Sequence, residues 1–188
     1  FLEVIVANGF EKKALKILKL KKNVRLIDSS KISFNEIWKF NSVDNFTLIQ
    51  SEDRKIFSKK DFRIVSKKKP NKSQLDNLMF AFNVCRYAKS NAIVLASNKS
   101  TVGIGSGQPS RLDSCEIAID KMNKFSKFKN DIVAASDAFF PFVDGVEKLF
   151  QSGVSAIVQP AGSIRDKEII KFANETNTVL IFSKTRHF

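Results

Sequence analysis

Three glycines at alternate positions, followed by an arginine, are the residues in this sequence best suited to bind an anion. Gly103, Gly105 and Gly107 precede Arg111 near the expected start of a helix. Backbone N–H groups at a helix start, together with a nearby guanidinium, attract phosphates and carboxylates. The spacing matches neither a Walker loop nor a dinucleotide-binding fingerprint. The glycines can equally serve only a sharp strand-to-helix turn, with Arg111 in solvent, so both interpretations remain open.

Polar loops are also expected at the carboxyl ends of buried parallel strands, where ligands of open α/β sheets gather. Residues 136–142 hold Asp137 and a run of phenylalanines, which can form a wall for a planar heterocycle or simply pack in the core. Residues 159–166 contain Gly162, and Arg186 follows the last expected strand. Because these strand ends lead to polar or glycine-containing segments at one edge of a sheet, the sequence predicts one shared binding site.

Residue sets typical of several common active sites are not evident. No Ser–His–Asp set, paired-carboxylate motif or metal-binding cluster stands out, and the one histidine, His187, is predicted to lie on the surface. Cys85 and Cys115 have neither metal nor redox spacing. We expect both to be buried free thiols, which suits a reducing, cytoplasmic location.

The composition restricts the classes of partner. Lysine and arginine number 32 against 19 acidic residues, which gives a formal net charge of +13. The lysines are scattered along the chain, so we expect a solvated basic surface that attracts anionic small molecules, and no nucleic-acid partner. No apolar run reaches the ~18 residues that a membrane-spanning helix needs, so no membrane partner is expected.

The apolar pattern predicts an α/β fold in two parts. Residues 1–70 are expected to form an irregular α+β segment, and the charged run that ends at Pro70 marks the boundary with residues 71–188. The elements expected in the first part are a buried strand over 1–7, a helix over 11–20 and strands over 24–27, 46–49 and 62–65.

The second part has a more regular order. Ser73 is expected to cap a helix, which is followed by a hairpin and then by alternating helices and short apolar strands. That alternation is typical of parallel strands buried on both faces, so we expect three layers, α/β/α, around a mixed sheet. The expected helices span 73–88, 109–122, 144–151 and 165–174, and the expected strands span 91–96, 101–104, 131–135, 154–158 and 178–182.

This order of elements is shared by the zinc nucleobase deaminases. Their chemistry needs an H-x-E motif and a later P-C-x-x-C motif. The comparable positions here, residues 108–111 and 138–142, hold Gln-Pro-Ser-Arg and Ala-Phe-Phe-Pro-Phe, which supply no zinc ligand. We therefore expect a cytidine-deaminase-like fold that lacks the zinc site.

Six segments together resemble the AICAR transformylase/IMP cyclohydrolase family of purine biosynthesis. They lie in the family's order with similar spacing and are distributed over almost the whole chain. The segments are FLEVIVANGF (1–10), KSNAIVLA (89–96), TVGIGSGQPSRLDS (101–114), SDAFFPFVDGVE (136–147), SGVSAIVQPAGSIRDKEII (152–170) and TRHF (185–188). The resemblance falls in the carboxyl-terminal part of the transformylase region, which in the family is built from two deaminase-like units.

The resemblance implies transfer of a formyl group from the co-substrate 10-formyltetrahydrofolate to aminoimidazole carboxamide ribonucleotide (AICAR). It implies that Asn91 orients the reacting amine, while the general base lies outside this sequence. The residues implied to bind AICAR are Asn91, Arg111, Phe139 and Arg186. Those implied to contact folate are Leu112, Asp144, Ser163 and Ile164. A structural potassium ion is implied near Ser90 and Asp137, and no zinc is implied.

The resemblance also implies that parts of the enzyme lie outside these residues. The family's catalytic Lys-His segment and its cyclohydrolase domain have no counterpart here, and the family's active sites form in a homodimer. We therefore expect this chain alone to hold half a site and to have little or no transformylase activity. The alternative interpretation is a nucleotide- or folate-binding module without catalysis.

Overall fold

The computed structural model describes residues 2–33, 38–125 and 131–187. The chain forms two compact units, Phe1–Glu52 and Asp53–Phe188. The division expected after residue 70 falls inside the second unit, because residues 62–64 pair with the main sheet of that unit.

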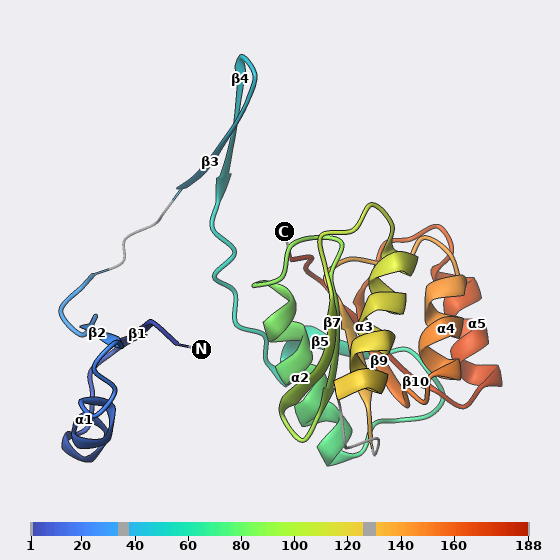
Figure 1. The fold of residues 1–188 in the computed structure, drawn as a ribbon. Helices are drawn as coiled ribbons and strands as arrows, with labels where there is room; N and C mark the ends of the chain where they lie inside the picture. The colour runs from blue at the N-terminus through green and yellow to red at the C-terminus, as the bar shows by residue number, and fades with distance from the viewer. Residues whose placement is uncertain (1, 34–37, 126–130, 188) are drawn as a thin grey trace. The chain divides into compact units, whose positions relative to one another are not determined.

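In the first unit, the described residues form a helix and strands but no buried core. Its elements are β1 (Val4–Ala7), α1 (Lys12–Leu18), β2 (Arg25–Asp28), β3 (Trp38–Val43) and β4 (Phe46–Ser51). The strands β1 and β2 pair in parallel, with α1 between them in the chain, and β3 and β4 form an antiparallel hairpin (Figure 1). None of the described residues of this unit is buried, so β1 is not the buried strand expected over 1–7, and the hairpin exposes Trp38, Phe40 and Phe46. The strand β3 was not predicted.

The second unit is built on a mixed sheet of six strands. Its strands are β5 (Phe62–Ile64), β6 (Ile93–Ser97), β7 (Ser100–Gly105), β8 (Val133–Ser136), β9 (Ala156–Pro160) and β10 (Val179–Ser183), and a short 3-10 helix, Lys59–Asp61, precedes β5. Their order across the sheet is β5-β10-β9-β8-β6-β7. The strands β8, β9 and β10 are parallel, and β6 and β7 form a hairpin, so both of these predictions are confirmed.

Helices cover both faces of this sheet (Figure 1). They are α2 (Lys72–Cys85) on one face, and α3 (Arg111–Phe125), α4 (Asp144–Gln151) and α5 (Asp166–Glu175) on the other. Alternate side chains of β6 serve the two faces, because Leu95 packs with the α3 side and Val94 with the α2 side. The predicted α/β fold with a mixed sheet is confirmed, and the likeness to a deaminase stays a prediction. Among the described residues, no helix is both long and apolar enough to cross a membrane.

The helix α2 begins before the residue predicted to cap it. Asn71, rather than Ser73, is its N-cap: the Asn71 side chain accepts the backbone N–H of Gln74 at 2.8 Å. The Gln74 side chain in turn accepts the backbone N–H of Asn71 at 3.0 Å. This reciprocal pair satisfies two N–H groups that a helix start otherwise leaves unpaired.

The alternate glycines bring a helix against the sheet. A Cβ added to Gly103 would lie 2.0 Å from the carbonyl oxygen of Ala118, and one added to Gly105 would lie 1.9 Å from that of Ser114. Because α3 packs directly on the backbone of β7 at these two points, neither position has room for a side chain. Gly107, at φ +70°, serves the turn. Packing therefore explains most of the pattern that suggested an anion-binding loop.

Both cysteines are free and buried, as predicted. Burial raises the pKa of the Cys115 thiol to about 12 and that of the Cys85 thiol well above its usual range. The two thiols therefore stay protonated at neutral pH, and they act as small apolar side chains in the core.

Candidate functional site

A cleft of about 570 Å³ opens at one end of the sheet of the second unit. Five segments line it: residue 91, which precedes β6; residues 109–112, at the start of α3; residues 138–142, which follow β8; residue 144, at the start of α4; and residue 186, which follows β10. Because β6 runs antiparallel to β8, its beginning lies beside the end of β8. Three of the strand ends named from the sequence, those after β7, β8 and β10, therefore contribute to this cleft, whereas residues 159–166, which include the end of β9, do not line it.

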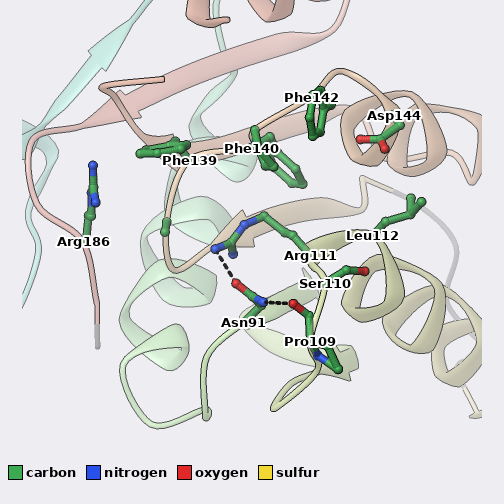
Figure 2. Close-up of a pocket in the computed structure, with 12 residues that line it drawn as sticks. Asn91, Pro109, Ser110, Arg111, Leu112, Phe139, Phe140, Phe142, Asp144 and Arg186 are labelled. Atoms are coloured by element: carbon green, nitrogen blue, oxygen red, sulfur yellow. Dashed lines mark hydrogen bonds between the residues drawn. The ribbon is translucent and has the colours of Figure 1, made fainter. Parts of the chain in front are cut away.

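Six of the residues implied by the resemblance line this cleft (Figure 2). They are Asn91, Arg111, Leu112, Phe139, Asp144 and Arg186. Ser90 and the buried Asp137 do not line the cleft but join its network of hydrogen bonds. Ser163 and Ile164 are not among the lining residues, and the Ile164 side chain is fully exposed.

The carboxylate of Asp137 holds Arg111, a lining residue of the cleft, in a network of hydrogen bonds. It pairs with the guanidinium of Arg111 and accepts the hydroxyl of Ser90 at 2.5 Å. The Asp137 side chain is 1% exposed and that of Arg111 is 9% exposed, so the ion pair is largely shielded from solvent. A buried ion pair needs its remaining donors satisfied, and Arg111 also donates to Ser136 Oγ at 3.0 Å and to Asn91 Oδ1 at 2.9 Å.

This network fixes the orientation of the Asn91 amide. Its Oδ1 accepts from Arg111, so its Nδ2 is the end that donates to the backbone carbonyls of Gln108 at 2.9 Å and Pro109 at 3.2 Å. Figure 2 shows the bonds of Asn91 to Arg111 and to Pro109. Both N–H groups of the amide are thereby occupied, while Oδ1 keeps one lone pair for a further donor. Asn91 can therefore accept a hydrogen bond from an amine in the cleft.

Arg111 reaches this position because α3 begins at Arg111, two residues after the start predicted at Pro109. Ser110 caps the helix, since its hydroxyl accepts the backbone N–H of Asp113 at 3.0 Å. Ser110 also lines the cleft. Ser110 was not predicted to belong to the site, although a serine just before a helix is a recognisable cap.

Aromatic rings and a cation form the more open side of the cleft. The guanidinium carbon of Arg186 lies 4.6 Å from the centre of the Phe139 ring, and the two lie side by side in Figure 2. Phe142 also lines the cleft, whereas the largely buried Phe140 belongs to the core cluster as well. The phenylalanine run therefore serves both purposes left open by the sequence. In the described part of the chain, no carboxylate pairs with the exposed Arg186.

His187 is buried, which contradicts the prediction of a surface position. Its side chain is 1% exposed, and its ring centre lies 4.8 Å from that of Phe57 and 4.6 Å from that of Phe82. Its Nδ1 is hydrogen-bonded to the carboxylate of Asp53, 134 residues away in the sequence. No local pattern predicts a contact over that separation, so a position near the chain end was a poor guide to exposure.

No group of three or more His, Cys, Asp or Glu residues that could hold a metal ion occurs in the described ranges. Potassium takes oxygen ligands, but both carboxylate oxygens of Asp137 already accept from Arg111 and Ser90. Each of these oxygens keeps a further lone pair, so the two hydrogen bonds neither supply nor exclude a potassium site. The potassium site stays a prediction.

Comparisons with known proteins agree with the resemblance. A family model described as AICARFT/IMPCHase bienzyme matches residues 1–121. The chain is 40% identical over 188 residues to the bifunctional purine biosynthesis protein PurH of Chlorobium chlorochromatii, and 45% identical over 191 residues to that of Buchnera aphidicola subsp. Schizaphis graminum. It is also 40% identical over 188 residues to the PurH of Aquifex aeolicus. Each alignment covers 100% of this chain but 36% of the relative, so the chain spans only about a third of these proteins.

Proposed function

Because this chain belongs to the AICARFT/IMPCHase bienzyme family, we propose that it supplies part of a formyltransferase site of purine biosynthesis. The reaction would move a formyl group from 10-formyltetrahydrofolate to the 5-amino group of AICAR. One observation supports this proposal most: residues implied to bind the two substrates come from separate segments and line one cleft.

The chemistry of the lining suits AICAR. Arg186 offers an anionic phosphate an exposed guanidinium that pairs with no carboxylate of the described residues. The Phe139 ring offers an apolar face to the imidazole ring, and Asn91 Oδ1 can accept from the amine. We propose that Arg111 acts mainly by holding Asn91 and Asp137, because its charge is already balanced by a buried carboxylate.

The folate would occupy the part of the cleft at the starts of α3 and α4. Leu112 lies at the start of α3, and Asp144 lies close to Phe142 in Figure 2. Such a combination can hold the flat pterin of a folate against apolar surface, with a carboxylate to accept its N–H groups. Contacts from Ser163 and Ile164 stay a prediction, since neither residue lines the cleft.

The formyl transfer also needs a proton acceptor, because the amine of AICAR loses a proton as it attacks. The residues that line the described cleft include no histidine or lysine, and the nearby Asp137 carboxylate is occupied by Arg111. We propose that the acceptor comes from another segment of a longer protein or from a second subunit. The cleft described here would then bind and orient the substrates.

Binding of AICAR to the chain tests the proposed site directly. We expect isothermal titration calorimetry to detect binding of AICAR, with weaker binding of the nucleoside that lacks the phosphate. Arg186→Ala should weaken AICAR binding by about 10- to 100-fold, because a charge-assisted contact is lost. The control is Arg63→Ala, which removes an exposed arginine from β5 without touching the cleft. Equal affinities of Arg186→Ala and the unaltered chain would contradict the proposal.

A formyl-transfer assay separates the enzyme part from the alternative, a binding module without catalysis. We expect little or no turnover by residues 1–188 alone. Turnover should appear when the chain is mixed with the portion of Buchnera PurH that precedes its matched region, since that relative is 45% identical to this chain. Turnover by the chain alone would refute the expected dependence on other segments. A mixture that binds AICAR but transfers no formyl group would favour the binding module.

A further inference from the structure

The segment that follows β10 sends neighbouring side chains in different directions. Arg186 reaches the cleft, where its guanidinium lies over the Phe139 ring (Figure 2). Thr185 and His187, its two neighbours in the sequence, instead contact residues 53–57. Because Thr185 and His187 are both held by these contacts, the backbone on either side of Arg186 is fixed, which restricts the direction that the Arg186 side chain can take.

Three kinds of contact hold His187. Because a carboxylate only accepts, the Nδ1–H of His187 donates to Asp53. The ring packs edge to face on Phe57 and at a tilt on Phe82, a residue of α2. The backbone N–H donates to the carbonyl of Asp137 at 2.9 Å. His187 thus contacts the segment before β5, the helix α2 and Asp137, which directly follows β8.

Packing alone does not explain a histidine at this position. Its Nε2 is buried without a hydrogen-bond partner among the described residues, and an unpaired buried polar atom reduces stability. A leucine would fill the space between the two phenylalanine rings without that loss. The histidine adds a directed hydrogen bond to Asp53, which a leucine cannot make.

We propose that Asp53 and His187 are positioning residues for the cleft. Their hydrogen bond anchors the terminal segment, so that Arg186 is already directed over Phe139 when an anionic ligand arrives. Holding a binding group in place before the ligand binds avoids the loss of its freedom on binding. Only the identity of the ligand rests on the proposed function, because the placement of Arg186 belongs to the chain itself.

The first experiment needs no ligand. In NMR spectra of the chain labelled at arginine, the ring current of Phe139 should change the chemical shifts of the Arg186 side chain. Phe139→Leu removes the ring and should give the Arg186 chemical shifts without that effect. We expect Asp53→Asn, which keeps the shape of the side chain, to move the Arg186 resonances most of the way to those chemical shifts. Asp120→Asn makes the same change at an exposed position of α3 and should leave them in place. Unmoved Arg186 resonances in Asp53→Asn overturn the proposal.

The second experiment measures AICAR affinity by calorimetry. Asp53→Asn should weaken binding by about 3- to 30-fold, a typical size for an effect carried through a neighbouring residue. In an Arg186→Ala background the same substitution should change nothing further. Equal weakening in both backgrounds would show a general structural role and overturn the proposal.

A conservative variant separates positioning from packing. His187→Asn keeps an N–H donor near the place of Nδ1, so it should recover part of the affinity lost in His187→Leu. An affinity of His187→Leu equal to that of the unaltered chain overturns the proposal. If the unaltered chain binds no AICAR, the proposed function fails, while the Arg186 resonances still decide this inference.

Discussion

Arg111→Ala should lower the free energy of unfolding of the second unit by about 3–5 kcal/mol, because it leaves a buried carboxylate without its cation. The Asp137 side chain is 1% exposed, so its carboxylate depends on Arg111 rather than on water for its compensation. The same substitution removes the donor that orients Asn91. Chemical denaturation followed by far-ultraviolet circular dichroism measures the effect.

Two variants sharpen this test. Arg165→Ala removes an arginine whose partner, Glu168, is 57% exposed, so its cost should stay below about 1 kcal/mol. The double variant Arg111→Ala/Asp137→Ala should lose less stability than the two single variants summed, since neither charge is then left unpaired. If Arg111→Ala lowered the free energy of unfolding as little as Arg165→Ala does, Arg111 would be a solvated surface residue and this prediction would be wrong. Because Arg111→Ala is expected to destabilise the fold, a loss of ligand binding in that variant would be ambiguous. Arg186→Ala is therefore the better test of ligand binding.

Gly105→Ala should destabilise the second unit by about 3 kcal/mol, because its methyl group would collide with the backbone of α3. The added Cβ would lie 1.9 Å from the carbonyl oxygen of Ser114, and neither β7 nor α3 can move away without disturbing the core. Denaturation followed by circular dichroism again gives the result. Ser100→Ala, at the exposed start of the same strand, should change stability little.

A third substitution distinguishes packing from turn formation in the glycine pattern. Gly107 has φ +70°, and an added Cβ would meet only the Lys89 side chain, at an ordinary contact distance of 3.6 Å, so Gly107→Ala should cost only about 1–2 kcal/mol of backbone strain. The expected order is therefore a larger loss at Gly105 than at Gly107. The reverse order would show that the glycines serve chiefly the turn, as one interpretation of the sequence had it.

Elements with a strong local pattern could be predicted from the sequence. The strands β8, β9 and β10 are short apolar runs between helices, and α4 has the bounds that were expected for it, 144–151. Boundaries elsewhere differ by a few residues because caps such as Asn71 decide them. The strand β3 has apolar residues at alternate positions, Trp38 and Phe40, so its signal was present but was not used.

Some features of the site could likewise be predicted from the sequence, and others could not. Phe139 and Arg186, which follow β8 and β10, could be grouped because the topology of a parallel sheet brings the ends of its strands together. Asn91, which precedes the antiparallel strand β6, was named only from the family resemblance. The partners of individual side chains could not be predicted. Asp53 and His187 are hydrogen-bonded although 134 residues separate them in the sequence. The ion pair between Arg111 and Asp137 depends on how α3 packs. Such contacts follow from the folded arrangement and not from any local spacing.

The hairpin of the first unit determines which optical signal can follow unfolding. Trp38 is the one tryptophan of the sequence, and it stands 54% exposed on a unit whose described residues include no buried one. Its emission therefore reports the surroundings of β3 rather than the core of the six-stranded sheet. The one tyrosine, Tyr87, is 77% exposed and adds little contrast. A blue shift of the Trp38 emission would instead report that another surface has covered the hairpin, which makes this fluorophore a built-in sensor of association.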